Sequence, residues 1–203
     1  MQIFIAGSHT DVGKTAVSAA LCHAFNLEYF KLVQAGIPQD CDRVKTLSPK
    51  TKIHTNGITL QTPASPHIAM QKEGIFYKGL EIPLPKTQNL LVESAGGLFT
   101  PLDLVCCMID YLEASRLPCV LVGGYYLGGI NHILLSLKAL EARGIPLLCL
   151  IISGDQNPQM DSFIAEYAKI NIAHFPNFYD TKSFESQTQA LKQEIMAFKI
   201  FNL

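Results

Sequence analysis

The chain has 203 residues, of which 48% are hydrophobic and 16% are charged. A chain of this length and composition can bury a sizeable core as one domain, which excludes intrinsic disorder and a miniature disulfide scaffold. Sixteen Lys and Arg residues against 17 Asp and Glu residues give a formal net charge of −1, so no global positive field attracts nucleic acid or an anionic membrane. Any anion-binding site must therefore be local.

Short continuous apolar runs alternate with longer amphipathic stretches along the chain. The runs predict strands at residues 2–7, 29–34, 89–95, 119–124, 147–153 and 171–175. The stretches predict helices at residues 14–26, 103–115, 130–143, 159–169 and 184–197. This alternation is typical of a parallel sheet that is covered by helices on both faces. We therefore expect an α/β fold with a single-domain, doubly wound and mostly parallel sheet.

The segment 36–88 interrupts this alternation. It is rich in Thr, Pro and Gly, and its helical patches, near residues 41–47 and 66–72, are short. An irregular insertion of this length in a compact domain usually has a function or is partly mobile. We expect one domain over residues 1–203 in which the segment 36–88 covers the active site at the ends of the strands.

Cysteine usage and hydropathy bear on the cellular compartment. The six cysteines include no Cys-x-x-Cys pair, which favours buried thiols in a reducing cytosol over disulfides or metal ligands. The spacings of His9, His67, His132 and His174 likewise match no zinc template. No basic region begins a signal peptide, and the longest apolar stretches, of about eight residues, fall short of the roughly 18 that span a bilayer. We therefore expect a cytoplasmic protein with no membrane or nucleic-acid partner.

A glycine-rich loop at residues 7–15 joins the first predicted strand to the first predicted helix, and it reads GSHTDVGKT. The backbone N–H groups of such a loop form an anion-binding nest, while Lys14 can reach the β- and γ-phosphates and the Thr15 hydroxyl can ligate Mg²⁺. The pattern G-x-x-x-x-G-K-[ST] is missed by one position, because Ser8 stands where the first glycine belongs. The place of the loop between strand and helix still predicts a P-loop NTPase-like nucleotide site rather than an ordinary turn.

Five separated motifs extend this pattern along the chain. They are TDVGKT at residues 10–15, Lys31, SPH at 65–67, VESAGG at 92–97 and LGGINH at 127–132. In order and spacing they resemble the dethiobiotin synthetase family, from residue 2 to about residue 153. The resemblance implies a homodimer that converts 7,8-diaminopelargonic acid, CO₂ and ATP, with Mg²⁺, into dethiobiotin, ADP and phosphate in biotin biosynthesis. This cyclo-ligase reaction passes through a carbamate and its phosphorylated mixed anhydride.

The resemblance also implies residue roles. Lys14 would hold the γ-phosphate, Lys31 would point its ammonium at the carbamate and the transferring group, and Asp11 would orient a substrate amine. Without the resemblance, the favoured interpretation of Lys31 is a solvated lysine at a strand end. For Asp11 the alternative is a loop residue that satisfies its own backbone. The nucleotide contacts correspond to Asp11, Val12, Gly13, Lys14, Thr15, Ala16, Glu93, Gly96 and Ser153.

Metal and substrate contacts follow from the same resemblance. The protein ligands of Mg²⁺ correspond to Thr15, Asp42 and Glu93, although Asp40 lies only two residues from Asp42. Glu93, which ends an apolar strand, also occupies the position of a Walker B acid. The substrate contacts correspond to Thr10, Lys31, Ala35, Gly96, Gly97, Leu127, Gly128 and Asn131. The last three would come from the partner subunit, at a helix N-terminus that suits a carboxylate.

The sequence departs from the family pattern at several positions. Ala35 cannot donate the hydrogen bond of the usual Ser or Thr, and Ser94 replaces a glycine. Ser153 stands where many members have an asparagine that reads adenine, which predicts weak selectivity among nucleotide bases. Two other functions stay open at this point: a switch ATPase of the partitioning type and a degenerate homologue that only binds nucleotide. The loop lacks the second lysine that is usual in the switch ATPases.

Overall fold

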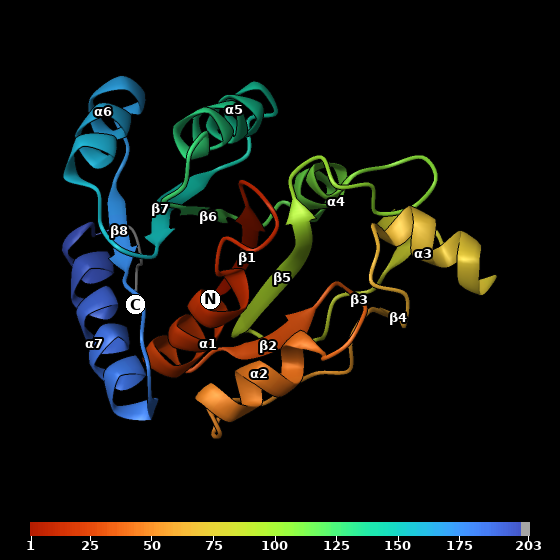
Figure 1. The fold of residues 1–203 in the computed structure, drawn as a ribbon. Coiled ribbons are helices and arrows are strands. Elements are labelled where there is room, and N and C mark those ends of the chain that lie inside the picture. Colours follow the sequence, from red (N-terminus) through yellow and green to blue (C-terminus); the bar gives the residue numbers. More distant parts are fainter. Residues whose placement is uncertain (200–203) are drawn as a thin grey trace.

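A six-stranded parallel sheet forms the centre of the protein (Figure 1). The computed structural model describes residues 1–199. In spatial order the strands are β2 (Glu28–Lys31), β5 (Leu90–Gly97), β1 (Gln2–Gly7), β6 (Cys119–Gly124), β7 (Leu147–Ser153) and β8 (Ile172–Phe175). Neighbouring strands pair in parallel throughout this order, which confirms the predicted sheet.

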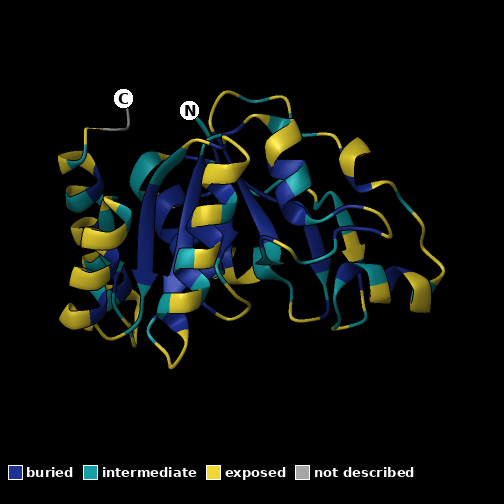
Figure 2. Cartoon of the chain, turned by 90° about the horizontal axis from the view of Figure 1, so that it is seen from above, coloured by how far each residue is buried: buried dark blue, intermediate teal, exposed yellow. Residues whose placement is uncertain are grey.

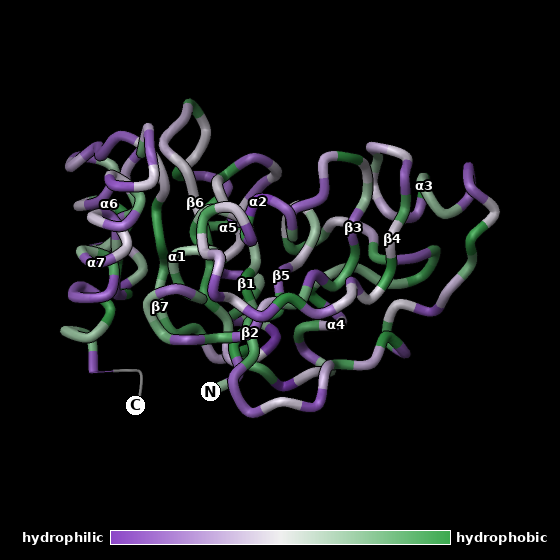
Figure 3. Tube along the Cα trace, turned by 90° about the horizontal axis from the view of Figure 1, so that it is seen from below, coloured by the Kyte–Doolittle hydropathy of each residue, from purple (hydrophilic) through white to green (hydrophobic). Residues whose placement is uncertain are grey.

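Helices cover both faces of this sheet, as a doubly wound fold requires. One face carries α1 (Lys14–Phe25), α2 (Asp40–Leu47) and α7 (Thr181–Ala197), and the other carries α4 (Met108–Ser115), α5 (Gly129–Ala142) and α6 (Pro158–Ala168). The side chains of β1 alternate between two cores: Ile3 and Ile5 pack with residues of α1 and α7, whereas Phe4 packs with residues of α4 and α5. Figure 2 shows the buried strands between helices with exposed outer surfaces, and Figure 3 shows hydrophilic segments recurring along α6 and α7.

A second, two-stranded parallel sheet adjoins the edge of the main one. The predicted strand 29–34 divides at Leu32, after which β3 (Val33–Ala35) pairs with β4 (Ile58–Leu60). The N–H of Leu32 donates to the carbonyl of Glu93 at 3.0 Å, while the carbonyl of Leu32 accepts from the N–H of Ile58 at 3.1 Å, so the chain changes partner at this residue. Besides α2 and β4, the segment 36–88 carries α3 (Pro66–Glu73) and a 3₁₀-helix, Gly79–Glu81.

The predicted helix 103–115 begins later than expected, at Met108. The carboxylate of Asp103 accepts hydrogen bonds from the backbone N–H groups of Gly79, Val105 and Cys106, at 2.6, 2.8 and 2.8 Å. A short acidic side chain that binds nearby N–H groups in this way favours a turn over a helix. The turn also connects the 3₁₀-helix to the chain that follows β5.

The cysteines behave as small apolar side chains. Cys22, Cys41, Cys106, Cys107, Cys119 and Cys149 are free thiols, and all but Cys41 and Cys107 are buried. Burial raises the pKa of the Cys149 thiol to about 12, so this group stays protonated and unreactive. Within residues 1–199 no helix is both long and apolar enough to cross a bilayer.

Candidate functional site

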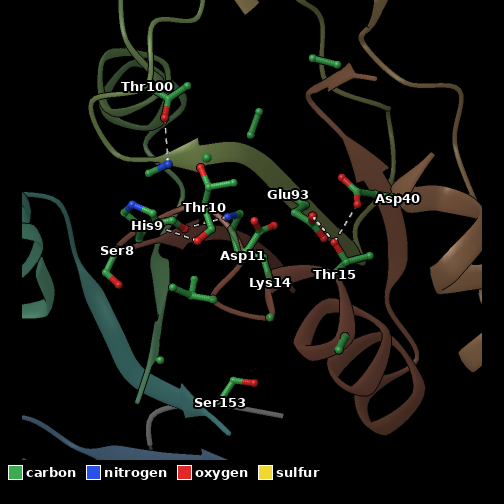
Figure 4. A pocket seen from close by; sticks show the side chains of 18 of the residues that line it. Ser8, His9, Thr10, Asp11, Lys14, Thr15, Asp40, Glu93, Thr100 and Ser153 are labelled. Atoms are coloured by element: carbon green, nitrogen blue, oxygen red, sulfur yellow. Dashed lines mark hydrogen bonds between the residues drawn. The ribbon is translucent and has the colours of Figure 1, made fainter. Parts of the chain in front are cut away.

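A cleft of about 1680 Å³ opens at the carboxyl ends of the strands. Its walls come from the loop after β1, from the ends of β2, β5 and β7, and from residues on both sides of β4 in the segment 36–88. Figure 4 shows side chains of the loop after β1 together with Glu93 and Asp40 around this space. Ligands of open α/β sheets bind beyond the carboxyl ends of the strands, so this cleft is the candidate site.

The loop between β1 and α1 closes around the ammonium group of Lys14. Lys14 Nζ donates to the carbonyl of His9 at 3.2 Å. A Cβ atom at Gly7 would lie 2.8 Å from Lys14 Nζ and 2.9 Å from the carbonyl oxygen of Gly96. The close approach of these groups therefore requires a glycine at position 7, one residue before the place that the usual motif gives it.

Lys14 is a buried cation with a second cation nearby. Burial disfavours its charged form, and the positive charge of Lys31 adds to this effect, so the pKa of Lys14 falls from 10.5 to about 8. The carboxylates of Glu93, Asp40 and Asp11 act in the opposite direction but do not cancel the shift. A bound polyphosphate would favour the ammonium form of Lys14, so anion binding and protonation of Lys14 would stabilise each other.

We expect nucleotide affinity to fall as the pH rises through this pKa. Below about pH 8 the Lys14 ammonium is already charged in the free protein, whereas above it each binding event must also take up a proton. The dissociation constant for an ATP analogue, measured by calorimetry, should therefore be about tenfold higher at pH 9 than at pH 7. Lys14→Met should bind more weakly and lose this pH dependence; an equally steep profile in the variant would assign the titration to another group.

Lys31, Asp40, Glu93 and Thr15 form one hydrogen-bonded cluster inside the cleft. Lys31 and Glu93 are register partners on β2 and β5. Lys31 Nζ lies 2.6 Å from Asp40 Oδ2 and 2.8 Å from Glu93 Oε1. The Thr15 hydroxyl lies 2.9 Å from Asp40 Oδ1 and 3.1 Å from Glu93 Oε1. Lys31 is 3% exposed and Glu93 is fully buried, so each charge depends on its partners for stabilisation.

The charges of this cluster stabilise one another. Burial opposes the charge on Lys31, but Glu93 and Asp40 outweigh it and raise the pKa of the Lys31 ammonium. Burial also opposes the charge on Asp40, yet Lys31 beside it lowers the pKa of the Asp40 carboxyl.

Tyr29 also belongs to this cluster, and the sequence pattern did not single it out, although it lies two residues before Lys31 and so on the same face of β2. Its hydroxyl donates to Glu93 Oε2 at 3.2 Å.

Asp40, and not the expected Asp42, lies in this cluster, so the geometry favours Asp40 as the metal ligand. Asp40 is the first residue of α2, and its N–H donates to Gln34 Oε1 at 3.0 Å, which fixes the start of the helix. Residues two apart on a helix point in different directions. Asp42 is accordingly exposed, whereas Asp40 contacts both Thr15 and Lys31.

The donor set fits a hard divalent cation. Thr15, Asp40 and Glu93 present one hydroxyl and two carboxylates, and the Thr15 hydroxyl lies within 3.1 Å of a carboxylate oxygen of each. Mg²⁺ is usually bound by one or two carboxylates together with waters and substrate phosphates. Among residues 1–199 no group of three or more His, Cys, Asp or Glu side chains could hold a metal ion, and a Mg²⁺ site of this composition does not need one.

The other predicted site residues fall into two groups. Those that line the same cleft are Thr10, Asp11, Val12, Gly13, Ala16, Ala35, Gly96, Gly97 and Ser153. Ser153 lies directly against the loop, since a Cβ at Gly13 would come 2.5 Å from Ser153 Oγ. In contrast, Leu127, Gly128 and Asn131 are exposed at the start of α5 and, in the part of the chain that the structure describes, do not line the cleft.

Known proteins resemble this chain over nearly its whole length. A family model described as an AAA domain matches residues 1–182. The ATP-dependent dethiobiotin synthetase BioD of Campylobacter jejuni is 50% identical over 200 residues, which cover 98% of this chain and 100% of the relative. The enzyme of the same name from Rhodopseudomonas palustris is 42% identical over 172 residues, covering 82% of this chain and 81% of the relative.

Solved structures share the fold at much lower identity. A putative plasmid partition protein from Borrelia burgdorferi, bound to AMPPNP, superposes with a TM-score of 0.55 at 11% identity, covering 97% of this chain and 98% of that one. The septum site-determining protein MinD from Pyrococcus horikoshii, complexed with Mg-ADP, gives 0.54 at 13% identity and covers 100% of both chains. These likenesses show a P-loop NTPase-like fold and nothing about the reaction.

Proposed function

The chain belongs to the dethiobiotin synthetase family, and we propose that the cleft described above carries out its reaction with the residues assigned below. The enzyme is an ATP-dependent cyclo-ligase that forms dethiobiotin. One amine of 7,8-diaminopelargonic acid loses a proton and adds to CO₂ as a carbamate. A carbamate oxygen then takes the γ-phosphoryl group of ATP and releases ADP, and the second amine attacks the carbamoyl carbon, closing the ring and expelling phosphate.

Two ammonium groups would stabilise the negative charge that develops on the phosphates and the carbamate during this reaction. Lys14, enclosed by the loop after β1, would bind the β- and γ-phosphates, and Lys31, in the adjoining cluster, would stabilise the carbamate and the transferring phosphoryl group. The observation that carries the proposal is the convergence of both lysines with Glu93, Asp40 and Thr15 in one cleft. Ser153, beside the loop, would contact the nucleotide.

Magnesium completes this arrangement in our proposal. Thr15, Asp40 and Glu93 would hold the ion, because their oxygens lie together and are of the hard type that Mg²⁺ prefers. When bound, Mg²⁺ neutralises charge on the phosphates of ATP. Within the chain itself, Thr15 adjoins Lys14 at the start of α1, so the metal and phosphate contacts share one helix N-terminus.

The diamine end of the substrate would lie across the loop from the phosphates. Thr10 and Asp11 line the cleft, and the Asp11 carboxylate could hold a substrate ammonium. Gly96 and Gly97 leave room for main-chain contact with the carbamate, and Thr100 Oγ1 accepts the N–H of Gly97 at 2.9 Å, which fixes this turn. Ala35 would contribute apolar contact only.

We also propose a homodimer, because Leu127, Gly128 and Asn131 lie outside the cleft of their own chain. Leu127 is fully exposed just before the N-terminus of α5, where backbone N–H groups suit the substrate carboxylate of a partner subunit. Mixing Lys31→Ala with Asn131→Asp subunits after reversible dissociation tests this. Hybrid dimers would hold one intact site, so a 1:1 mixture should recover about a quarter of wild-type activity. No recovery, with hybrids demonstrated by mass spectrometry, would contradict the shared site.

The reaction itself is tested by phosphate release. Release from ATP should require both 7,8-diaminopelargonic acid and bicarbonate, and dethiobiotin should appear in equal amount by mass spectrometry. A switch ATPase would release phosphate without the diamine, and a degenerate homologue would release none under any condition. Either result would overturn the proposed function.

The free cysteines support our further proposal that the enzyme works in the reducing cytoplasm.

A further inference from the structure

Lys31 is bonded to the same two carboxylates that would hold the metal ion. Its Nζ lies 2.6 Å from Asp40 Oδ2 and 2.8 Å from Glu93 Oε1. We propose that Lys31 is an internal cation that competes with Mg²⁺ for Asp40 and Glu93, and that it leaves them for the carbamate position when the metal binds with ATP. This inference rests on the magnesium site of the proposed function. It gives Lys31 a second role, as the cation that occupies the two carboxylates before the metal binds.

Every carboxylate oxygen of the pair already has a donor. Lys31 donates to Glu93 Oε1 and pairs with Asp40 Oδ2, Tyr29 donates to Glu93 Oε2, and the single proton of the Thr15 hydroxyl can go to Asp40 Oδ1, the nearer of its two carboxylate neighbours. The two hydroxyl groups are neutral and can rotate to present a lone pair. Lys31 cannot, because an ammonium group has donors only. A divalent cation that binds both carboxylates would therefore meet the Lys31 ammonium on Asp40 Oδ2 and Glu93 Oε1, and the repulsion between two cations at this distance favours the departure of Lys31.

The structure also provides a place for the displaced group. Lys31 Nζ donates to the carbonyl of Ser94 at 3.0 Å, and Ser94 leads directly into Ala95, Gly96 and Gly97, which line the cleft. The four-carbon stem of a lysine can rotate while its ammonium group keeps this acceptor. Displacement from the carboxylates would thus turn the ammonium toward the substrate side. Binding of MgATP would therefore also move the Lys31 ammonium to the carbamate position.

The competition predicts that free metal binds poorly until Lys31 is removed. Mn²⁺ binding to the nucleotide-free enzyme, followed by electron paramagnetic resonance, should be at least about tenfold tighter in Lys31→Met than in the wild type. Lys14→Met is the matched control, because Lys14 is also buried but donates to the His9 carbonyl instead of the carboxylates. Its effect should stay below about threefold. Equal effects of the two variants, or no tightening in Lys31→Met, would overturn the proposal.

A second measurement uses the wild-type enzyme and so does not depend on whether Lys31→Met folds. In protein labelled with ¹⁵N-lysine, the Nζ resonance of Lys31, assigned with Lys31→Arg, should move when Mg²⁺ and a non-hydrolysable ATP analogue are added together. The analogue with EDTA should leave it nearly unchanged. An equal shift in both samples would mean that the nucleotide, not the metal, moves Lys31.

Glu93→Gln separates the failure of this inference from the failure of the metal site. With the ATP analogue present, Mn²⁺ affinity should fall at least about tenfold in Glu93→Gln. If it is unchanged, the metal site in the proposed function is wrong. If it falls while Lys31→Met binds Mn²⁺ as the wild type does, the metal site stands and the competition by Lys31 is refuted.

Discussion

Lys31→Ala should lower kcat by about 10³-fold while MgATP binds at least as tightly as to the wild type. The ammonium of Lys31 bonds to Glu93, Asp40 and the carbonyl of Ser94, beside the predicted transfer site, whereas Lys14 belongs to the loop that would hold the triphosphate. Loss of this ammonium should therefore lower the rate of the step in which negative charge develops, rather than the affinity for MgATP. Single-turnover rates and calorimetry of the same preparations measure the two effects separately.

Two controls accompany this variant. Lys31→Arg keeps the positive charge but replaces a compact ammonium with a planar fork, so a loss of at least about tenfold is expected in this tightly enclosed position. Lys52→Ala removes an exposed lysine that pairs with Glu28 and should leave kcat within about twofold. A normal rate in Lys31→Ala, with a folded protein shown by circular dichroism, would remove Lys31 from the mechanism.

Apolar patterning was sufficient to predict the main sheet because its strands are buried on both faces. β1, β6 and β7 have the bounds that their uninterrupted apolar runs indicate. The pattern could not reveal that the run 29–34 changes sheets, since Leu32 is as apolar as Phe30 and Val33 and only its hydrogen-bond partners mark the change. Likewise, the late start of α4 depends on the turn at Asp103, whose carboxylate binds the N–H groups of Val105 and Cys106 and also the N–H of Gly79, 24 residues away in sequence.

The site residues were likewise predictable where a local pattern places them, and not where a contact with a distant residue decides. Lys14 could be placed in the cleft because it begins the helix after the glycine-rich loop, and Lys31 because it ends β2, although only the family resemblance singled out Lys31 for a role. Glu93 could be placed there as an acid in an apolar strand, four residues before the end of β5. Asp40 and Asp42 could not be distinguished by type or local spacing. The choice between them depends on where α2 begins, and this in turn depends on Gln34, whose amide oxygen accepts the N–H of Asp40. The signal in the sequence for this contact was Gln34 itself, a polar residue in the predicted strand 29–34.

The choice between the two aspartates makes a sharp prediction. Asp40→Asn should lower kcat/KM by about 100-fold at low Mg²⁺, because an amide is a weaker ligand for a hard cation than a carboxylate. Part of the loss should be recovered by raising Mg²⁺, since the other two proposed ligands, Thr15 and Glu93, are intact. The measurement is the Mg²⁺ concentration for half-maximal dethiobiotin formation, which should rise at least about tenfold.

Asp42→Asn is the matched control, with the same chemical change two residues away. Asp42 is exposed on α2, so its substitution should change neither the Mg²⁺ requirement nor kcat/KM by more than about twofold. The Asp40 variant should keep its fold, because its side chain is 31% exposed and Lys31 retains Glu93 as a partner. The reverse result, with Asp42→Asn impaired and Asp40→Asn normal, would mean that α2 rotates or rewinds when MgATP binds.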